Sequence, residues 1–98
     1  MIDIEAKYLD QIKRILSAQI PGYEVWAFGS RVNGRAKKYS DLDLVVTGAV
    51  PLDWRKLEGL KTAFSESDLP FMVDVLDWHS IRAEFRRVIK ERYEVLQK

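Results

Sequence analysis

The chain contains no cysteine, and His79 is its only histidine. The first absence excludes disulfides, thiolate metal sites and a cysteine nucleophile. A single histidine also offers no pattern for a histidine metal site. No apolar run approaches the roughly 18 residues of a membrane-spanning helix, and the acidic amino-terminal sequence does not have the pattern of a signal peptide. We therefore expect a cytoplasmic protein without a membrane segment.

An excess of charge of one sign is also lacking, because 16 basic residues stand against 15 acidic ones and the net charge is +1. This balance argues against bulk electrostatic binding of nucleic acid or of an anionic membrane. The 98 residues, of which 47% are hydrophobic, are expected to form one domain over residues 1–98 with no room for a second, substrate-binding domain. Substrate recognition is then expected to involve another chain.

Apolar residues at helical spacing, with Asp3 as the amino-terminal cap of the first series, predict helices over residues 4–20, 53–64 and 80–89. The predicted strands are residues 23–28, 41–47 and 71–76. Residues 30–34 are expected to form one or two helical turns, and the pattern leaves open whether residues 93–96 continue the last helix. This order predicts an α/β fold in which three core strands are flanked by about four helices.

A glycine–serine pair, Gly29-Ser30, follows the apolar strand that ends at Phe28. Glycine suits a backbone that must approach a phosphate closely, because it has no Cβ. Ser30 would place its hydroxyl and amide at a helix start, where free N–H groups favour an anion. The pair is therefore a candidate phosphate-binding turn. The alternative is a strand-ending turn with a serine cap.

Asp41 and Asp43 begin the second predicted strand, and ten residues separate Ser30 from Asp41. Residues at positions i and i+2 of a strand point to the same side of the sheet. Two carboxylates on one side repel each other unless a cation lies between them, and Mg²⁺ prefers oxygen ligands of this kind. The alternative, a solvated strand end, does not explain why the acids alternate with Leu42 and Leu44.

Asp74 interrupts the third predicted strand, which is otherwise apolar. An unpaired charge there would cost several kcal/mol, by the usual penalties for desolvation. Next to Asp41 and Asp43 it would complete a cluster of three carboxylates and could accept the proton of an attacking hydroxyl. Asp77 is the competing candidate, but three residues further on it lies on the opposite strand face and is expected to cap the following helix.

Basic residues crowd the segment between the Gly-Ser pair and the two aspartates. Arg31 is nearest the turn and is the best candidate for a phosphate contact, because a guanidinium forms paired hydrogen bonds with phosphate oxygens. Arg35, Lys37 and Lys38 fit a solvated loop equally well.

The chain resembles the minimal nucleotidyltransferases of the DNA polymerase β-like superfamily over nearly its whole length. The residues that carry this resemblance are Phe28-Gly29-Ser30-Arg31, Gly34, Ser40-Asp41-Leu42-Asp43-Leu44 and Val73-Asp74-Val75, with weaker support from Asp77-Trp78 and an expected helix over residues 85–96. The resemblance implies a small mixed β-sheet flanked by helices. It also implies that Gly29 and Ser30 hold a triphosphate, that Asp41 and Asp43 bind two Mg²⁺ ions, and that Asp74 is the third carboxylate.

The same resemblance implies a function and a partner. Such proteins transfer AMP from ATP to a hydroxyl, and many act as the antitoxin of a small all-helical HEPN protein encoded alongside them. A hetero-oligomer with such a partner is therefore expected. Two alternatives remain open, which are a non-catalytic module that neutralises its partner by binding alone and a catalytic subunit that modifies a small-molecule alcohol presented by its partner.

Overall fold

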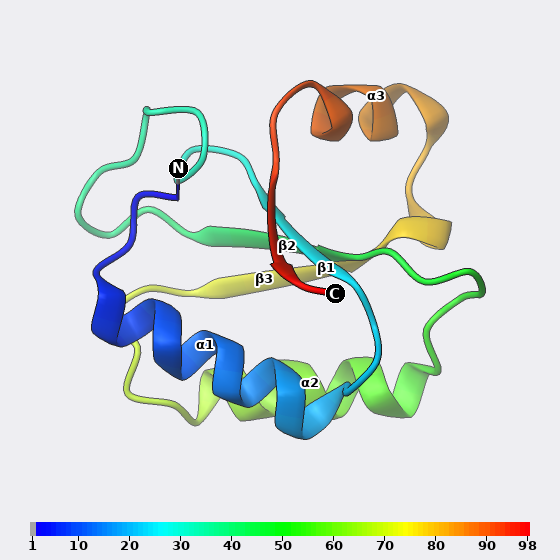
Figure 1. Ribbon diagram of the computed structural model, residues 1–98, viewed down its shortest axis with the longest axis horizontal. Coiled ribbons are helices and arrows are strands. Elements are labelled where there is room, and N and C mark those ends of the chain that lie inside the picture. The colour runs from blue at the N-terminus through cyan, green and yellow to red at the C-terminus, as the bar shows by residue number, and fades with distance from the viewer. Residues whose placement is uncertain (1) are drawn as a thin grey trace.

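The computed structural model describes residues 2–98, and its helices lie on both faces of a single sheet (Figure 1). In chain order, its elements are α1 (Ala6–Gln19), β1 (Val25–Phe28), β2 (Leu42–Val46), α2 (Trp54–Ser65), β3 (Val73–Asp77), the short 3₁₀ helix η1 (Trp78–Ser80), α3 (Ala83–Glu91) and β4 (Glu94–Gln97). No helix within residues 2–98 combines the length and the apolarity that crossing a membrane requires.

The sheet has the strand order β3-β2-β1-β4 and is mixed. β1 pairs antiparallel with both β2 and β4, whereas β2 pairs parallel with β3. Parallel neighbours need a crossover connection, and α2 supplies it between β2 and β3. The α/β class and the mixed sheet predicted from the sequence are confirmed.

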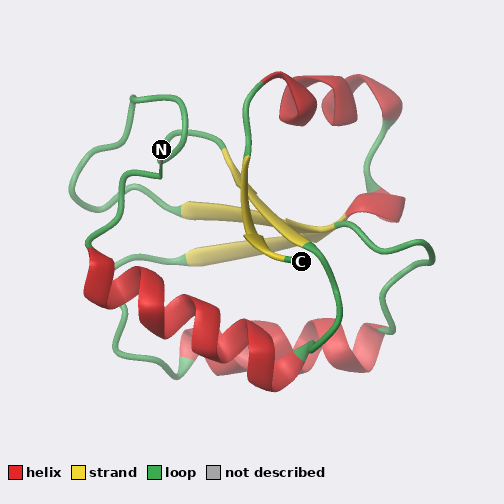
Figure 2. Ribbon diagram, viewed as in Figure 1, coloured by secondary structure: helices red, strands yellow, loops and turns green. Residues whose placement is uncertain are grey.

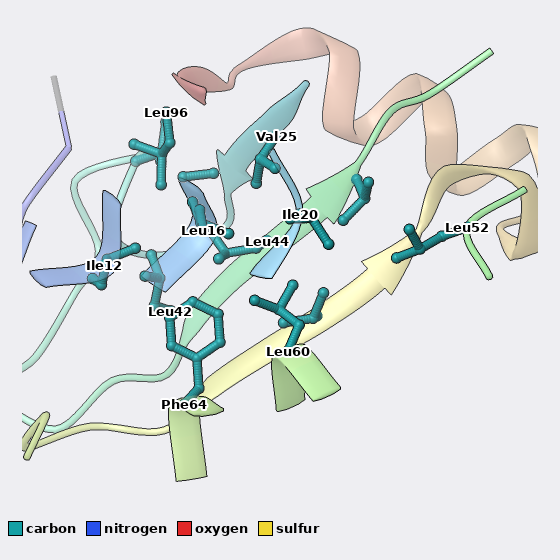
Figure 3. Close-up of a cluster of buried hydrophobic side chains, with 14 residues drawn as sticks. Ile12, Leu16, Ile20, Val25, Leu42, Leu44, Leu52, Leu60, Phe64 and Leu96 are labelled. Atoms are coloured by element: carbon teal, nitrogen blue, oxygen red, sulfur yellow. The ribbon is translucent and has the colours of Figure 1, made fainter. Parts of the chain in front are cut away.

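α1 and α2 cover one face of the sheet, and α3 covers part of the other (Figure 2). The larger core lies under α1 and α2, where Leu16 and Leu60 pack with Leu42 and Leu44 of β2 (Figure 3). A smaller cluster on the opposite face joins Phe28, Val45 and other residues to α3. β2 is thus buried on both faces, because apolar side chains alternate toward each of them.

The alternation along β2 decides where the polar site lies. Leu42, Leu44 and Val46 are buried on the side of α1 and α2, as predicted. Asp43 therefore points to the other face, together with Val45, because successive strand residues alternate. The only acid within β2 consequently faces the side that α3 covers.

A fourth strand replaces the expected continuation of the last helix. The helix implied over residues 85–96 ends at Glu91, and the backbone of Arg92 is extended, with φ −157° and ψ 115°. The chain then pairs with β1, with Val95 opposite Trp26 and Glu94 opposite Ala27. The prediction of three core strands was therefore wrong, because pairing with a strand distant in sequence overrides a helical pattern that continues weakly.

Two helical predictions also need correction. Residues 30–34 form a hydrogen-bonded turn, in which the amides of Val32 and Asn33 both donate to the Gly29 carbonyl, and no helix follows. There are consequently three α-helices and one 3₁₀ helix within residues 2–98. Asp3 does not cap α1, because its amide donates to the Arg31 carbonyl (2.6 Å) and Glu5 occupies the cap position.

Candidate functional site

A cleft of about 620 Å³ lies between the turn that follows β1, the exposed part of β2 and the helix α3. Gly29 and Asp43 form one side of it, and Phe85 and Val88 of α3 contribute apolar surface. The remaining lining residues include Asn33, Arg35, Glu91 and Arg92. The cleft therefore brings together a turn, two acids, an apolar helix face and two guanidinium groups.

Gly29 and Asp43 are in direct contact at the base of this cleft. The φ angle of Gly29 is +84°, a left-handed conformation that side chains disfavour. A Cβ at Gly29 would lie 2.5 Å from Oδ2 of Asp43. The contact follows from the strand register, which places Phe28 opposite Asp43. Glycine is therefore required by the backbone and also by the carboxylate that lies against it.

Three carboxylates affect one another at this end of the sheet. Asp43 pairs in register with Asp74 on the parallel neighbour β3, and Asp41 precedes it by two residues. Burial raises the pKa of Asp43 to about 6 from its ordinary 3.8, and the charges of Asp74 and Asp41 contribute in the same direction. The site thus carries an unbalanced negative charge that a cation would relieve.

The cluster suits a hard cation, because every atom that it offers as a metal ligand is a carboxylate oxygen. Asp41 and Asp74 are exposed, whereas Asp43 is half-buried. Within the described residues, no three His, Cys, Asp or Glu side chains are arranged closely enough to hold a metal ion. The predicted three-carboxylate metal site therefore stays a prediction, for which the electrostatics and the donor type are suitable.

The structure confirms the capping role predicted for Asp77, whereas the role of Asp74 stays a prediction and one argument for it was wrong. Its strand β3 lies at the edge of the sheet and Asp74 is exposed, so no desolvation penalty applies. Asp77 is buried, and its carboxylate accepts hydrogen bonds from the amides of Leu52 (3.1 Å) and His79 (3.2 Å). Asp77 is thus a structural cap, as predicted.

Arg31 has different partners from those expected of a phosphate-binding residue. It is buried, and Nε, Nη1 and Nη2 donate to the carbonyls of Ser40 (2.8 Å), Asp3 (2.9 Å) and Lys38 (3.2 Å), respectively. Its guanidinium also lies 4.3 Å from the ring centroid of Phe71. Since each guanidinium nitrogen is already engaged, this arrangement does not favour the predicted phosphate contact and gives Arg31 a positioning role.

Sequence reasoning missed the contribution of α3 to the cleft. Phe85, Val88 and Arg92 line it together with Asp43, although they lie far from the Gly-Ser turn along the chain. The exposed fractions of Phe85 (41%) and Val88 (56%) are high for apolar side chains. No local pattern could assign them to the site, because only the packing of α3 on Phe28 and Val45 brings them there.

Comparison with known sequences gives two findings. The family model described as "Nucleotidyltransferase domain" matches residues 9–96. The chain is also 52% identical over 96 residues to a protein of Haemophilus influenzae named "Probable protein adenylyltransferase MntA", with 98% of this chain and 84% of the relative covered.

Three solved structures with a similar fold are toxin–antitoxin complexes. A mutant MntA complex has a TM-score of 0.73 at 24% identity, covering 90% of this chain and 71% of that one. A toxin–antitoxin complex with AMP-PNP has a TM-score of 0.66 at 25% identity, with the same coverage. The MNT antitoxin complex with the tri-AMPylated HEPN toxin of Shewanella oneidensis has a TM-score of 0.62 at 22% identity, covering 95% and 71%.

Replacing Gly29 with alanine tests the contact with Asp43. Gly22 is the matched control, because its φ of +83° is nearly identical but no atom lies within 4 Å of the position that a Cβ would take there. Backbone strain should lower the unfolding free energy by about 1–2 kcal/mol in both variants. Only Gly29→Ala should also shift the pKa of Asp43, measured by carbon-13 NMR titration, because the carboxyl must move away. Equal pKa values in both variants would contradict the contact.

Asp43→Asn should raise the Tm of the metal-free protein near neutral pH. The folded-state pKa of about 6 exceeds the ordinary value of 3.8, so the folded protein loses stability as pH rises between these values. The difference in Tm between variant and wild type should therefore be largest above about pH 7 and vanish near about pH 4. The exposed Asp68 provides the control variant Asp68→Asn, and a pH-independent difference would contradict the electrostatic origin.

Arg31→Ala should destabilise the fold by about 1.5–3 kcal/mol, because the loss of a charged donor leaves three carbonyls without their partner. Arg31→Lys should recover only part of this loss, since an ammonium cannot donate to three carbonyls in the fork geometry. Urea unfolding of both variants measures the effect. Unchanged stability in Arg31→Ala would contradict the positioning role.

Proposed function

Because the chain belongs to the nucleotidyltransferase domain family, we propose that it transfers AMP from ATP to a hydroxyl of a small helical partner protein of the HEPN type. The proposal includes dependence on Mg²⁺ and release of pyrophosphate. It is supported by the 52% identical relative, whose name describes a probable protein adenylyltransferase.

The observation that carries the proposal is the contact of an acidic cluster with a left-handed glycine turn. The carboxylate of Asp43 lies against Gly29, and its pKa is raised to about 6 by burial and by its acidic neighbours. A site of this kind gains stability when a cation binds, and a cation there also attracts phosphate. Nucleotidyl transfer requires both components next to each other.

In this proposal the acids hold the metal ions, and the turn holds the nucleotide. Asp41, Asp43 and Asp74 supply carboxylate oxygens for two Mg²⁺ ions. When bound, the ions neutralise phosphate charge and make the α-phosphorus more electrophilic. Gly29 and Ser30 contribute the backbone and hydroxyl groups of the turn to the phosphates. The chain itself thus contributes mainly positioning and charge.

The transfer step exchanges one phosphorus–oxygen bond for another. The acceptor hydroxyl attacks the α-phosphorus, and the bond to the oxygen that bridges the α- and β-phosphates breaks. Pyrophosphate leaves with that oxygen. Asp74 is exposed and pairs in register with Asp43, so its carboxylate is accessible to an acceptor hydroxyl from another chain. We assign to its carboxylate the removal of the hydroxyl proton.

The proposal includes a partner chain, which supplies the hydroxyl that accepts AMP. The structural relative with AMP-PNP is itself a toxin–antitoxin complex, which supports a hetero-oligomer here. The net charge of +1 does not favour bulk nucleic-acid binding as the alternative role. We therefore propose an antitoxin that acts in the cytoplasm by modifying its toxin.

Intact-mass measurement of the partner after incubation with this protein, ATP and Mg²⁺ tests the proposal. The wild-type protein should shift the partner mass by whole AMP units. Asp43→Asn should abolish the shift, because removal of one ligand charge removes the reason for a cation to bind. Asp68→Asn is the control acid outside the cluster and should retain activity.

Two further outcomes separate the alternatives. An unshifted partner that still co-purifies with the wild-type protein would favour a non-catalytic binding module. Label from ATP found on a small alcohol would identify that alcohol as the acceptor.

Asp74→Asn should slow AMP transfer by about 10²–10⁴-fold, which is typical for loss of a general base. A larger loss of transfer rate in Asp77→Asn than in Asp74→Asn would show that Asp74 is the wrong carboxylate.

A further inference from the structure

Two arginines from distant parts of the chain line the cleft that contains Asp43. Arg35 belongs to the loop after the Gly29 turn, and Arg92 follows the last residue of α3. Nη1 of Arg92 donates to the carbonyl of Asn33 (3.4 Å), which joins the end of α3 to that turn. The junction between α3 and β4 therefore reaches the side of the molecule on which the cleft lies.

Both guanidinium groups are exposed and free of ion pairs. Arg35 and Arg92 form no salt bridge with a carboxylate anywhere in residues 2–98, although Glu91 lines the same cleft. Arg31 differs from them because all three of its guanidinium nitrogens donate to backbone carbonyls, whereas in Arg92 only Nη1 does so. Of the three arginines near the turn, Arg35 and Arg92 are thus the ones whose guanidiniums can bind a ligand in the cleft.

The other surfaces of the cleft indicate the kind of ligand. Phe85 and Val88 are partly exposed and apolar, and they face the same space as Gly29 and Asp43. A ligand with an apolar part for this helix face and an anionic part for the guanidiniums suits the lining, and a cation at Asp43 would offset the charge of that carboxylate. A nucleoside triphosphate has this composition, with a base for the apolar surface and phosphates for the guanidiniums.

We propose that Arg92, together with Arg35, binds the phosphates of the nucleotide, so that the junction of α3 and β4 completes the nucleotide site. The assignment rests on the proposed function, because it takes the ligand to be ATP. It replaces the phosphate contact that Arg31 was expected to make. A guanidinium suits this role because its fork of donors matches phosphate oxygens.

Calorimetric titration of the full chain with Mg²⁺ and AMP-PNP tests this assignment. Arg92→Ala should weaken AMP-PNP binding about tenfold to a hundredfold, the range expected for the loss of a charge-assisted hydrogen bond. Arg92→Lys should recover part of the affinity, and Arg35→Ala should also weaken binding. Arg87→Ala is the matched control, because Arg87 is an exposed arginine of α3 that does not line the cleft.

Titration with adenosine in place of AMP-PNP separates phosphate contacts from a general loss of structure. Adenosine affinity should be the same in Arg92→Ala and in the wild type, whereas a disordered cleft would weaken both ligands. Equal AMP-PNP affinity in Arg92→Ala, Arg87→Ala and the wild type would overturn the assignment. Loss of AMP transfer with unchanged AMP-PNP affinity would overturn it as well, because Arg92 would then act on the acceptor.

The outcome for the wild type separates this inference from the proposed function. If the wild-type protein binds AMP-PNP and modifies its partner while Arg92→Ala behaves identically, only the role of Arg92 is wrong. If the wild-type protein does not bind AMP-PNP at all, the proposed function and the role of Arg92 are both wrong.

Discussion

The contact between the Gly29 backbone and the carboxylate of Asp43 is the constraint on which the site depends. The antiparallel register of β1 and β2 creates it by placing Phe28 opposite Asp43. The left-handed φ of Gly29 then turns the chain over the carboxylate, where a Cβ would lie 2.5 Å from Oδ2. A candidate phosphate-binding turn and a candidate cation-binding acid are thus held together by the pairing of two strands.

The two faces of the sheet differ in how much apolar surface they bury, and the contact between Gly29 and Asp43 lies on the face that α3 covers. One face is filled by α1 and α2 over a large apolar core. On the other, α3 covers Phe28 and Val45 but leaves the end near Asp43 open as a cleft. Most of the apolar burial therefore lies on the face opposite the cleft.

The negative charge of the acidic cluster destabilises the metal-free fold, and the same charge can attract a cation. Burial and the neighbouring charges raise the pKa of Asp43 to about 6, so the ionised carboxylate destabilises the metal-free fold at neutral pH. Arg31 does not relieve this charge, since its guanidinium is bound to the backbone. The negative charge remains available to a cation, and the proposed nucleotidyl transfer requires that cation.

The amino-acid sequence by itself determined the local features of this protein. The alternation of β2, the turn at Gly29 and the capping role of Asp77 could be predicted, because each depends on neighbours within a few residues. The tertiary structure alone decided that residues 94–97 form β4 and that Asp74 is exposed on an edge strand. It also decided that Arg31 donates hydrogen bonds to backbone carbonyls, whereas Arg92 lines the cleft. These features depend on segments far apart in the chain, whose pairing and packing no local periodicity records.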